Sequence, residues 1–304
     1  TLITQEMLSK GYLAADKVYV CTKHTPEILE GYFEALDDVF KLIKDCESGR
    51  DINSLLKVGF DVVDFGSFVS PKAVPQMRDT AKLISQLKLN NDTSLLSIVL
   101  NKRGVMEASS FDEISYIGYP FSISNIFQKK NSNKTIDDSL YLVDELINIC
   151  LKKNKKLLVY ISMAFGNPYN EKYSPEIVFH YINILSKMGV KYFTLADTVG
   201  VANNDLIKFI FEELSKININ LGAHFHSRPD LSYSKIEMAY KYGCNRFDST
   251  ISGIGGCPFA NDDLVGNIST QTLLNFVQSK KIKHSLNLLN LESACNEAKK
   301  LFKF

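Results

Sequence analysis

Short apolar or alternating runs recur along the chain from residue 58 onward, separated by segments whose apolar residues return every three or four positions. The short runs are typical of strands, and steps of three and four residues are typical of helices that bury one face. The pattern predicts seven strands, at 59–67, 94–100, 114–122, 156–164, 191–197, 219–226 and 245–252. Their regular alternation with helices predicts a parallel sheet joined by helical crossovers.

Two of the intervening helices carry clear start signals. One is expected to follow Thr135, a good N-cap residue. Another is expected after Ser174, with Pro175 at its first helical position and Gly189 at its end. Seven strand–helix units plus one more would close an eight-stranded (β/α) barrel, and this α/β barrel is the predicted fold. A doubly wound sheet is disfavoured, because no G-x-G-x-x-G follows an early strand.

The first 54 residues have a different pattern. Residues 18–22 have the composition of a strand, and residues 25–46 form a strongly amphipathic helical pattern that opens on Thr25 and Pro26. This segment either supplies the eighth barrel unit or is a separate appendage. We therefore expect an atypical N-terminal strand–helix segment at 1–54 and a barrel domain at 55–304.

Composition and charge narrow the range of partners. The 304 residues carry a formal net charge of +1, which indicates neither a nucleic-acid partner nor an anionic membrane surface. No apolar run approaches the ~20 residues that a membrane span needs. The six cysteines form no C-x-x-C pair, which favours reduced thiols and a cytoplasmic location. The sequence is compatible with a homodimer and does not determine the assembly.

Polar side chains that could carry chemistry follow several of the predicted strands. In a (β/α) barrel the carboxyl ends of the strands meet at one rim, where active sites lie. The candidates at this rim are Asp64, Asn101, Asp197, His224, His226 and Asn267.

His224 and His226 are expected to point to the same face, because side chains alternate along a strand. Two imidazoles with nearby oxygen donors suit a divalent ion such as Mn²⁺, Mg²⁺ or Zn²⁺. The alternative is a hydrogen-bonded histidine pair without a metal. The shared rim of polar residues favours the metal site.

The segment 252–262 is rich in glycine and contains Cys257. Its glycines predict a flexible backbone of the kind that active-site lids have. Cys257 could serve as an acid or base at a reacting carbon. The alternative is a buried, unreactive cysteine, which is the common fate of this residue type.

Five segments of the chain resemble 3-hydroxy-3-methylglutaryl-CoA lyases, metal-dependent enzymes of the (β/α)-barrel fold. The resemblance runs from about Leu55 to about residue 280, and condensing relatives such as isopropylmalate synthase share the H-x-H but not the cysteine loop. The matching segments are 66–77, 165–169, 196–201, 223–226 and 253–267.

The resemblance implies cleavage of hydroxymethylglutaryl-CoA, an acyl-CoA, to acetyl-CoA and acetoacetate with a divalent cation, Mg²⁺ or Mn²⁺. The implied metal ligands are His224, His226 and Asn267. The implied catalytic and supporting groups are His224, Asp64, Asp197 and Cys257. The implied substrate-binding residues are Asn101, Ser124 and Tyr160.

One feature of these lyases is absent. Their first strand ends in an Arg-Asp pair, and the nearest counterpart here is Lys23 with His24, neither of which is a conservative replacement. Residues 4–49 instead resemble the C-terminal tail of a class III pyridoxal-phosphate-dependent aminotransferase, without its pyridoxal lysine. We therefore expect a barrel whose first unit is missing or replaced, and impaired cleavage. The alternatives are a related aldolase or Claisen-type enzyme, and a non-catalytic barrel that binds metal or CoA.

Overall fold

The computed structural model describes residue 7 and residues 25–47, 53–89, 92–256 and 265–302. The chain divides into two compact units, Thr1–Asn53 and Ser54–Phe304. In the first unit, helix α2 (Pro26–Glu47) matches the helix expected at 25–46, and the Thr25 hydroxyl accepts a hydrogen bond from the Ile28 N–H at 3.4 Å. The strand expected at 18–22 lies outside the described residues. The replacement of the first barrel unit by residues 18–46 therefore stays a prediction.

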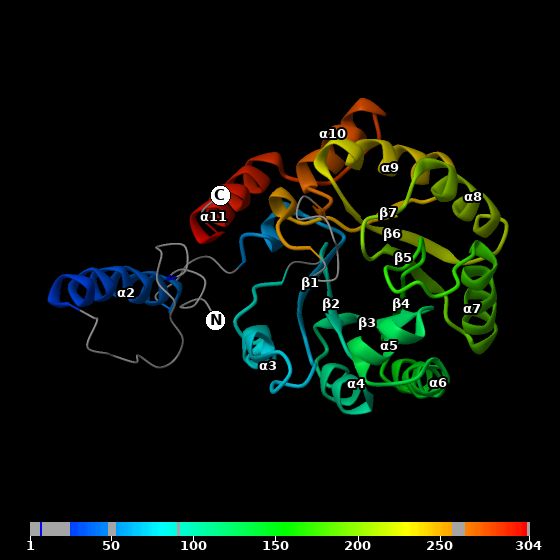
Figure 1. The fold of residues 1–304 in the computed structure, drawn as a ribbon, viewed down its shortest axis with the longest axis horizontal. Coiled ribbons are helices and arrows are strands. Elements are labelled where there is room, and N and C mark those ends of the chain that lie inside the picture. The colour runs from blue at the N-terminus through cyan, green and yellow to red at the C-terminus, as the bar shows by residue number, and fades with distance from the viewer. Residues whose placement is uncertain (1–6, 8–24, 48–52, 90–91, 257–264, 303–304) are drawn as a thin grey trace. The chain divides into compact units, whose positions relative to one another are not determined.

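The second unit is built on a curled sheet, which forms the centre of this part of Figure 1. Strands β1 to β7 lie side by side in chain order, and each pairs with the next in parallel. The short β8 pairs antiparallel with β6. The strands are β1 (Val62–Ser67), β2 (Ser94–Ile98), β3 (Ile114–Ser122), β4 (Lys156–Ser162), β5 (Tyr192–Asp197), β6 (Asn220–Ser227), β7 (Arg246–Phe247) and β8 (Gly266–Asn267).

Helices cover the outer face of this sheet (Figure 1). The helices of this unit are α3 (Thr80–Ile84), α4 (Lys102–Ala108), α5 (Asn125–Ser132), α6 (Ile136–Lys152), α7 (Pro175–Met188), α8 (Asn204–Leu214), α9 (Pro229–Lys241), α10 (Thr270–Ser279) and α11 (Leu288–Phe302). Helix α11 packs apart from the strands, in a small cluster with Val58. Three short 3₁₀ helices, η1 (Leu56–Val58), η2 (Pro75–Met77) and η3 (Ile251–Gly253), complete the described elements. The predicted barrel-type α/β fold is confirmed.

Local signals explain where the two best-marked helices begin. The Thr135 side chain accepts from the Asp138 N–H, and Asp138 accepts from the Thr135 N–H, which closes a capping box at α6. Helix α7 has Pro175 in its first turn and ends at Gly189, whose φ of 114° lies in the left-handed region. Both helices pack apolar residues against the sheet, where Phe193, Phe225 and their neighbours are fully buried.

The sheet is curled but not closed in the described part of the chain. Its two edge strands, β1 and β7, are not paired with each other, so the described residues form an open half-barrel. The strand expected at 245–252 shrinks to Arg246–Phe247, because beyond Phe247 the chain turns from β6 into the 3₁₀ helix η3. The strand expected at 59–67 begins only at Val62, after Gly59 adopts a φ of 86°.

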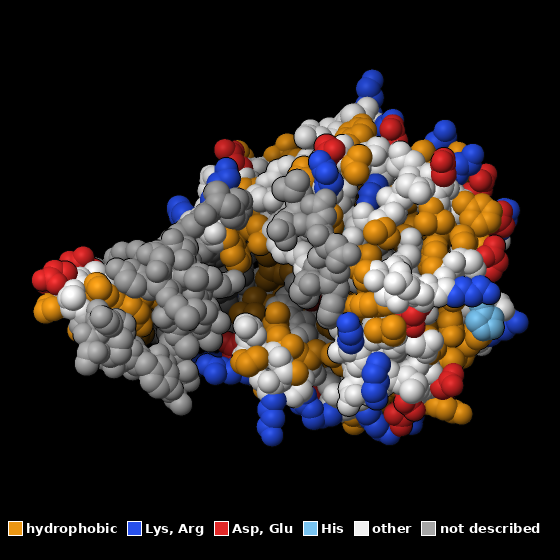
Figure 2. Space-filling view, in the orientation of Figure 1, with side chains coloured by type: hydrophobic (Ala, Val, Ile, Leu, Met, Phe, Trp, Pro, Cys, Tyr) orange, Lys and Arg blue, Asp and Glu red, His pale blue; other side chains and the backbone are white. Residues whose placement is uncertain are grey.

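The visible face of the molecule has a mixed charge pattern. In Figure 2, lysine and arginine side chains are interspersed with acidic ones over the helices, which is consistent with the formal net charge of +1. Among the described helices, none combines the length and apolarity that crossing a bilayer requires.

Candidate functional site

His224 and His226 lie at the end of β6 and face each other. Their Nε2 atoms are 3.2 Å apart, and their ring centroids are 5.1 Å apart. The intervening Phe225 points the other way and packs against Phe165 and Phe211 in the layer beneath the helices. Two imidazole nitrogens that each lie about 2.1 Å from one ion would be separated by about 3.0–3.4 Å. The observed spacing therefore fits two adjacent ligands of one metal ion.

Asp248 orients the first of these imidazoles. Its Oδ2 lies 3.1 Å from Nδ1 of His224. A carboxylate only accepts, so His224 donates from Nδ1, and in its neutral form it keeps a lone pair on Nε2, the atom that faces His226. Asp248 was not among the residues predicted from the sequence. The available signal was its position within the strand expected at 245–252, two residues after Arg246 on the same face.

His226 is held in its neutral form. Burial, and then the neighbouring charges of His224 and Lys235, together lower the pKa of His226 to about 4. Its Nδ1 is buried and has no hydrogen-bond partner among the described residues. A neutral imidazole is the form that binds metals. The side chain is therefore prepared as a ligand at physiological pH without deprotonation.

Asn267 lies on β8, directly opposite His226 in the antiparallel pair. Side chains of directly opposed residues share one face of a sheet and have neighbouring Cβ atoms. The Asn267 side-chain nitrogen donates to the Ile254 carbonyl at 3.0 Å, and its backbone N–H donates to the Gly255 carbonyl at 3.1 Å. These bonds leave the side-chain oxygen available as the third predicted metal ligand.

The glycine-rich segment holds Asn267 in place through its backbone. Gly255 has a φ of 85°, and a Cβ added there would lie 3.2 Å from the Asn267 side-chain nitrogen. Glycine adopts this left-handed conformation without strain, whereas other residues rarely do. In the described part of the loop, Gly255 thus allows a close backbone approach to Asn267, and the flexibility expected of the whole segment stays a prediction.

The donor set is compatible with a divalent ion. Among the described residues, no three His, Cys, Asp or Glu side chains stand close enough to chelate a metal. The expected third ligand, however, is the amide oxygen of Asn267, and Nε2 of His224 and Nε2 of His226 already converge. Two imidazoles and one amide oxygen, with the remaining positions left to water or substrate, suit a borderline ion.

Asp64, on β1, adds a carboxylate that titrates near neutrality. Its pKa is raised to about 7, first by desolvation and then by the charge of Asp248, while Gly66 and His224 act in the opposite direction. The side chain is nevertheless solvent-exposed. Protein atoms therefore surround the Asp64 carboxyl and raise its pKa, while water still reaches it. A carboxyl group with a pKa near 7 is suited to proton transfer at physiological pH.

Tyr160, on β4, completes the group. Its ring meets the His224 ring edge-on, with centroids 6.0 Å apart. Burial, followed by the charges of Asp248 and Asp64, raises the pKa of Tyr160 well above its usual value. Tyr160 is therefore a neutral donor beside the two histidines.

Asp197 faces away from the histidines. It pairs with Phe225 across β5 and β6, so its side chain lies on the helix-covered face, opposite to that of His224. Its Oδ2 lies 2.7 Å from Nζ of Lys235 on α9, and its Oδ1 accepts the Ala202 N–H at 3.0 Å. Lys235 also donates to the His226 carbonyl at 3.1 Å. The structure thus places Asp197 as a support for the backbone of His226, without contact to the reacting groups.

The Lys235–Asp197 pair yields a prediction about stability. Both side chains are almost completely buried, and removing one partner of a buried ion pair typically costs about 3–5 kcal/mol. We expect Lys235→Met to lower the free energy of unfolding, measured by urea denaturation, by about that amount. Lys280→Met, which removes an exposed partner of Glu237, is the control and should change stability little. Equal stability of the two variants would contradict this prediction.

Asn101 and Ser124, two of the expected substrate-binding residues, both act as helix N-caps. The Asn101 side-chain oxygen accepts the Gly104 N–H at 2.9 Å at the start of α4. The buried Ser124 hydroxyl accepts the Phe127 N–H at the start of α5 and donates to the Glu171 carboxylate. Ser124 therefore reaches a ligand only if Glu171 moves. Asn101 keeps its side-chain nitrogen for a ligand.

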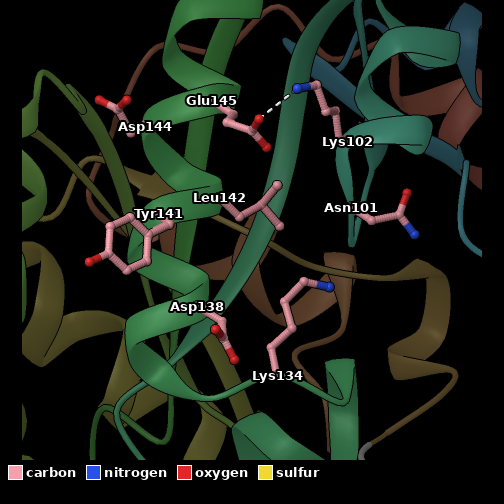
Figure 3. A pocket seen from close by; sticks show the side chains of 8 residues that line it. All are labelled: Asn101, Lys102, Lys134, Asp138, Tyr141, Leu142, Asp144 and Glu145. Atoms are coloured by element: carbon pink, nitrogen blue, oxygen red, sulfur yellow. Dashed lines mark hydrogen bonds and ion pairs between the residues drawn. The ribbon is translucent and has the colours of Figure 1, made fainter.

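A groove of about 560 Å³ lies beside Asn101 in the helix layer (Figure 3). It is lined by the start of α4 and one side of α6, where Lys102 pairs with Glu145. Lys134 projects toward the same gap, but Asp138, Asp144 and Glu145 give the lining more carboxylates than ammonium groups. A phosphate-rich ligand gains little from such a lining. The C-terminal end of β6 around His224, called the barrel mouth below, is thus the better candidate for the reaction site.

A comparison with protein families assigns this fold. The HMGL-like family matches residues 47–297, which is most of the chain. The chain belongs to the HMGL-like family. Members of this family typically depend on a divalent metal.

Characterised relatives of this HMGL-like protein are hydroxymethylglutaryl-CoA lyases. Hydroxymethylglutaryl-CoA lyase YngG of Bacillus subtilis is 29% identical over 245 residues, covering 80% of this chain and 81% of the relative. The mitochondrial enzyme of Macaca fascicularis is 30% identical, covering 81% and 75%. The cytoplasmic enzyme of Rattus norvegicus is 31% identical, covering 78% and 69%.

Solved structures agree with the family assignment. The HMG-CoA lyase of Bacillus subtilis superposes with a TM-score of 0.78 at 28% identity, covering 83% of this chain and 85% of that one. The HMG-CoA lyase of Acinetobacter baumannii, solved in complex with coenzyme A and 3-methylmalate, gives a TM-score of 0.76 at 29% identity, covering 83% and 82%. The fold is therefore the barrel-like fold of HMG-CoA lyases.

Three residues that the sequence predicts for the site fall outside the described part of the chain. Cys257, the expected catalytic cysteine, lies in the segment 257–264. Lys23 and His24, the expected replacements of the Arg-Asp pair, lie in the segment 8–24. Their roles stay predictions.

Proposed function

We propose that this HMGL-like protein is a divalent-metal-dependent carbon–carbon lyase that cleaves 3-hydroxy-3-methylglutaryl-CoA slowly to acetyl-CoA and acetoacetate. The observation that carries the proposal is the 3.2 Å approach of the His224 and His226 Nε2 atoms, oriented by Asp248 inside the barrel mouth. Family membership supports the reaction class. Mg²⁺ or Mn²⁺, held by His224, His226 and Asn267, would supply a Lewis acid that lowers the pKa of the substrate hydroxyl.

The residues around the pair would handle the protons. A base takes the proton of the tertiary hydroxyl, the adjacent C–C bond breaks, and its electron pair passes to the thioester enolate, which is then protonated at carbon. Asp64, whose pKa is raised to about 7, is proposed as a group that exchanges these protons. Cys257 is proposed as the acid that returns the proton. Tyr160 and Asp248 hold His224 in orientation.

An acyl-CoA is the proposed substrate class. The relative from Acinetobacter baumannii was solved with coenzyme A, and the other relatives are named as lyases of this thioester. The free, buried thiols of Cys150, Cys244 and Cys295 support a reducing compartment, and we propose the cytoplasm. Relatives occur both in the cytoplasm and in mitochondria.

Product analysis tests this function. Concentrated protein is incubated with Mn²⁺ or Mg²⁺ and a panel of acyl-CoA thioesters, and released acids and thioesters are measured by mass spectrometry. Equal amounts of acetoacetate and acetyl-CoA from hydroxymethylglutaryl-CoA, lost in Asp64→Asn, are expected. Products from another thioester alone would identify a related aldolase or Claisen-type enzyme. Metal and CoA binding without any product would identify a non-catalytic barrel.

The proposed role of Cys257 predicts selective alkylation. Burial raises the pKa of the Cys150 and Cys244 thiols to about 12 and that of Cys295 in the same direction, so these three should react slowly. We expect iodoacetamide to modify Cys257 ahead of them, and CoA with 3-methylmalate to protect it. Peptide mass spectrometry after a short pulse measures this order. Labelling of Cys257 that is no faster than that of Cys244 would remove it from the reaction.

A further inference from the structure

Arg246 places a guanidinium inside the barrel, one layer below the histidines. It lies on β7 and pairs with Gly222, two residues before His224 on β6. Its Nη2 donates to the Phe193 carbonyl at 2.7 Å and to the Thr194 hydroxyl at 2.8 Å, both on β5. The side chain therefore crosses β6 on the inner face of the sheet, the face from which His224 projects.

Gly222 makes room for this crossing. A Cβ at Gly222 would lie 2.6 Å from Nε and 2.7 Å from Nη2 of Arg246, closer than real Cβ contacts. Glycine at position 222 thus leaves space for the Arg246 side chain, and any residue with a Cβ there would displace that side chain. Nε of Arg246 is buried and has no acceptor among the described residues, and the two acceptors of Nη2 are neutral oxygens, so these hydrogen bonds do not neutralise the cation.

The layer above Arg246 is rich in carboxylates. Asp248, two residues further along the same face, contacts His224, and both Asp248 and Asp64 raise the pKa of Tyr160. Arg246 acts on Tyr160 in the opposite direction. The other buried cation beside β6, Lys235, lies on the outer face and pairs with Asp197. Within the described residues, Arg246 is thus a buried positive charge on the inner face of the sheet, the face that also carries His224.

We propose that Arg246 is a positioning residue that sets the charge balance of the candidate metal site: it lowers the affinity for a divalent cation and raises the affinity for an anionic ligand bound beside that cation. The inference rests on the proposed metal site. Charges separated by one barrel layer interact appreciably, because the protein interior screens them less than water does. In this way Arg246 supplies the site with an interior arginine, although the first-strand Arg-Asp pair of the lyases is replaced.

The two opposite effects make the inference testable. Arg246→Met removes the charge and keeps most of the volume. Calorimetry with Mn²⁺ should show binding about threefold to tenfold tighter than in the wild type. At saturating Mn²⁺, the small dicarboxylate 3-methylmalate should bind about threefold to tenfold more weakly. Structural damage alone would weaken both, so the opposite signs distinguish charge from folding.

Three further variants complete the experiment. Arg246→Lys keeps the charge and should return both affinities toward wild-type values. Arg103→Met removes an exposed arginine of α4 and should leave both unchanged. If Arg246→Met does not fold, the double variant Gly222→Ala with Arg246→Val is used in its place. It fills the same space without the charge.

Each outcome bears on a different statement. If the wild type binds Mn²⁺ but Arg246→Met leaves the affinities for Mn²⁺ and 3-methylmalate unchanged, or lowers both, the proposed role of Arg246 is wrong. The proposed metal site would still stand. A wild-type protein that binds no Mn²⁺ would overturn the proposed metal site, and the role of Arg246 with it.

Discussion

Changing Lys23 to Arg together with His24 to Asp is expected to raise the turnover of hydroxymethylglutaryl-CoA by about 10²–10³-fold. The resemblance to hydroxymethylglutaryl-CoA lyases implies a first-strand arginine that stabilises the developing enolate and an aspartate that completes the metal shell. Removal of one such electrostatic partner typically costs about 10²–10³ in rate. Neither a lysine nor a histidine reproduces the bidentate fork or the carboxylate. Acetoacetate release by the two proteins at equal Mn²⁺ measures the difference.

The matched control reverses the order of the new residues. Lys23→Asp with His24→Arg has the same composition, but it exchanges the positions of the carboxylate and the guanidinium. It should gain no activity if residues 18–22 are a strand in the expected register. Equal rates for the two double variants would show that the register is wrong. A wild-type turnover of about 1–10³ per second, typical of enzymes, would show that the pair is not required.

His226→Ala is expected to weaken binding of Mn²⁺ by about 10²-fold or more, because even groups that only orient metal ligands contribute about 10–100-fold. The substitution removes one of the two Nε2 atoms that converge at 3.2 Å. It leaves the backbone carbonyl that accepts from Lys235, so the strand end should stay in place. Calorimetric titration of metal-free protein with Mn²⁺ measures the affinity.

The control for this loss is His180→Ala, which removes an exposed imidazole on α7. It should bind Mn²⁺ as the wild type does. Identical affinity in His226→Ala and the wild type would exclude His226 as a ligand. The hydrogen-bonded histidine pair, without a metal, would then be the correct interpretation.

Sequence patterns predicted the regular elements well where the signal was local. The strand expected at 114–122 is β3, and Thr135 begins α6 with a capping box. Both depend on neighbouring residues in the chain, through side-chain alternation or a cap. The pattern failed for β7, which is two residues long, and gave no sign of β8. These short strands exist because β6 offers each of them an edge.

The candidate site was predicted in part. Strand alternation was enough to place His224 and His226 on one face, and their Nε2 atoms do meet. The pairing of β5 with β6 places Asp197 on the opposite face, and alternation within one strand could not show this. Its partner Lys235 lies 38 residues away on α9 and could not be paired with it from spacing. Asp248 and Arg246 were missed because their importance depends on what lies across β6.

The sequence by itself determined the order of strands and helices, the helix ends at Thr135 and Gly189, and the common face of His224 and His226. These features follow from steric and hydrogen-bonding rules that act over a few residues. Only the tertiary structure decided which further groups surround the histidines: Asp248 on Nδ1 of His224, Lys235 behind the strand and Arg246 beneath it. Those neighbours come from distant segments of the chain, and the curl of the sheet brings them together. The inner face of the sheet carries the histidines, and its outer face is buried against the helices.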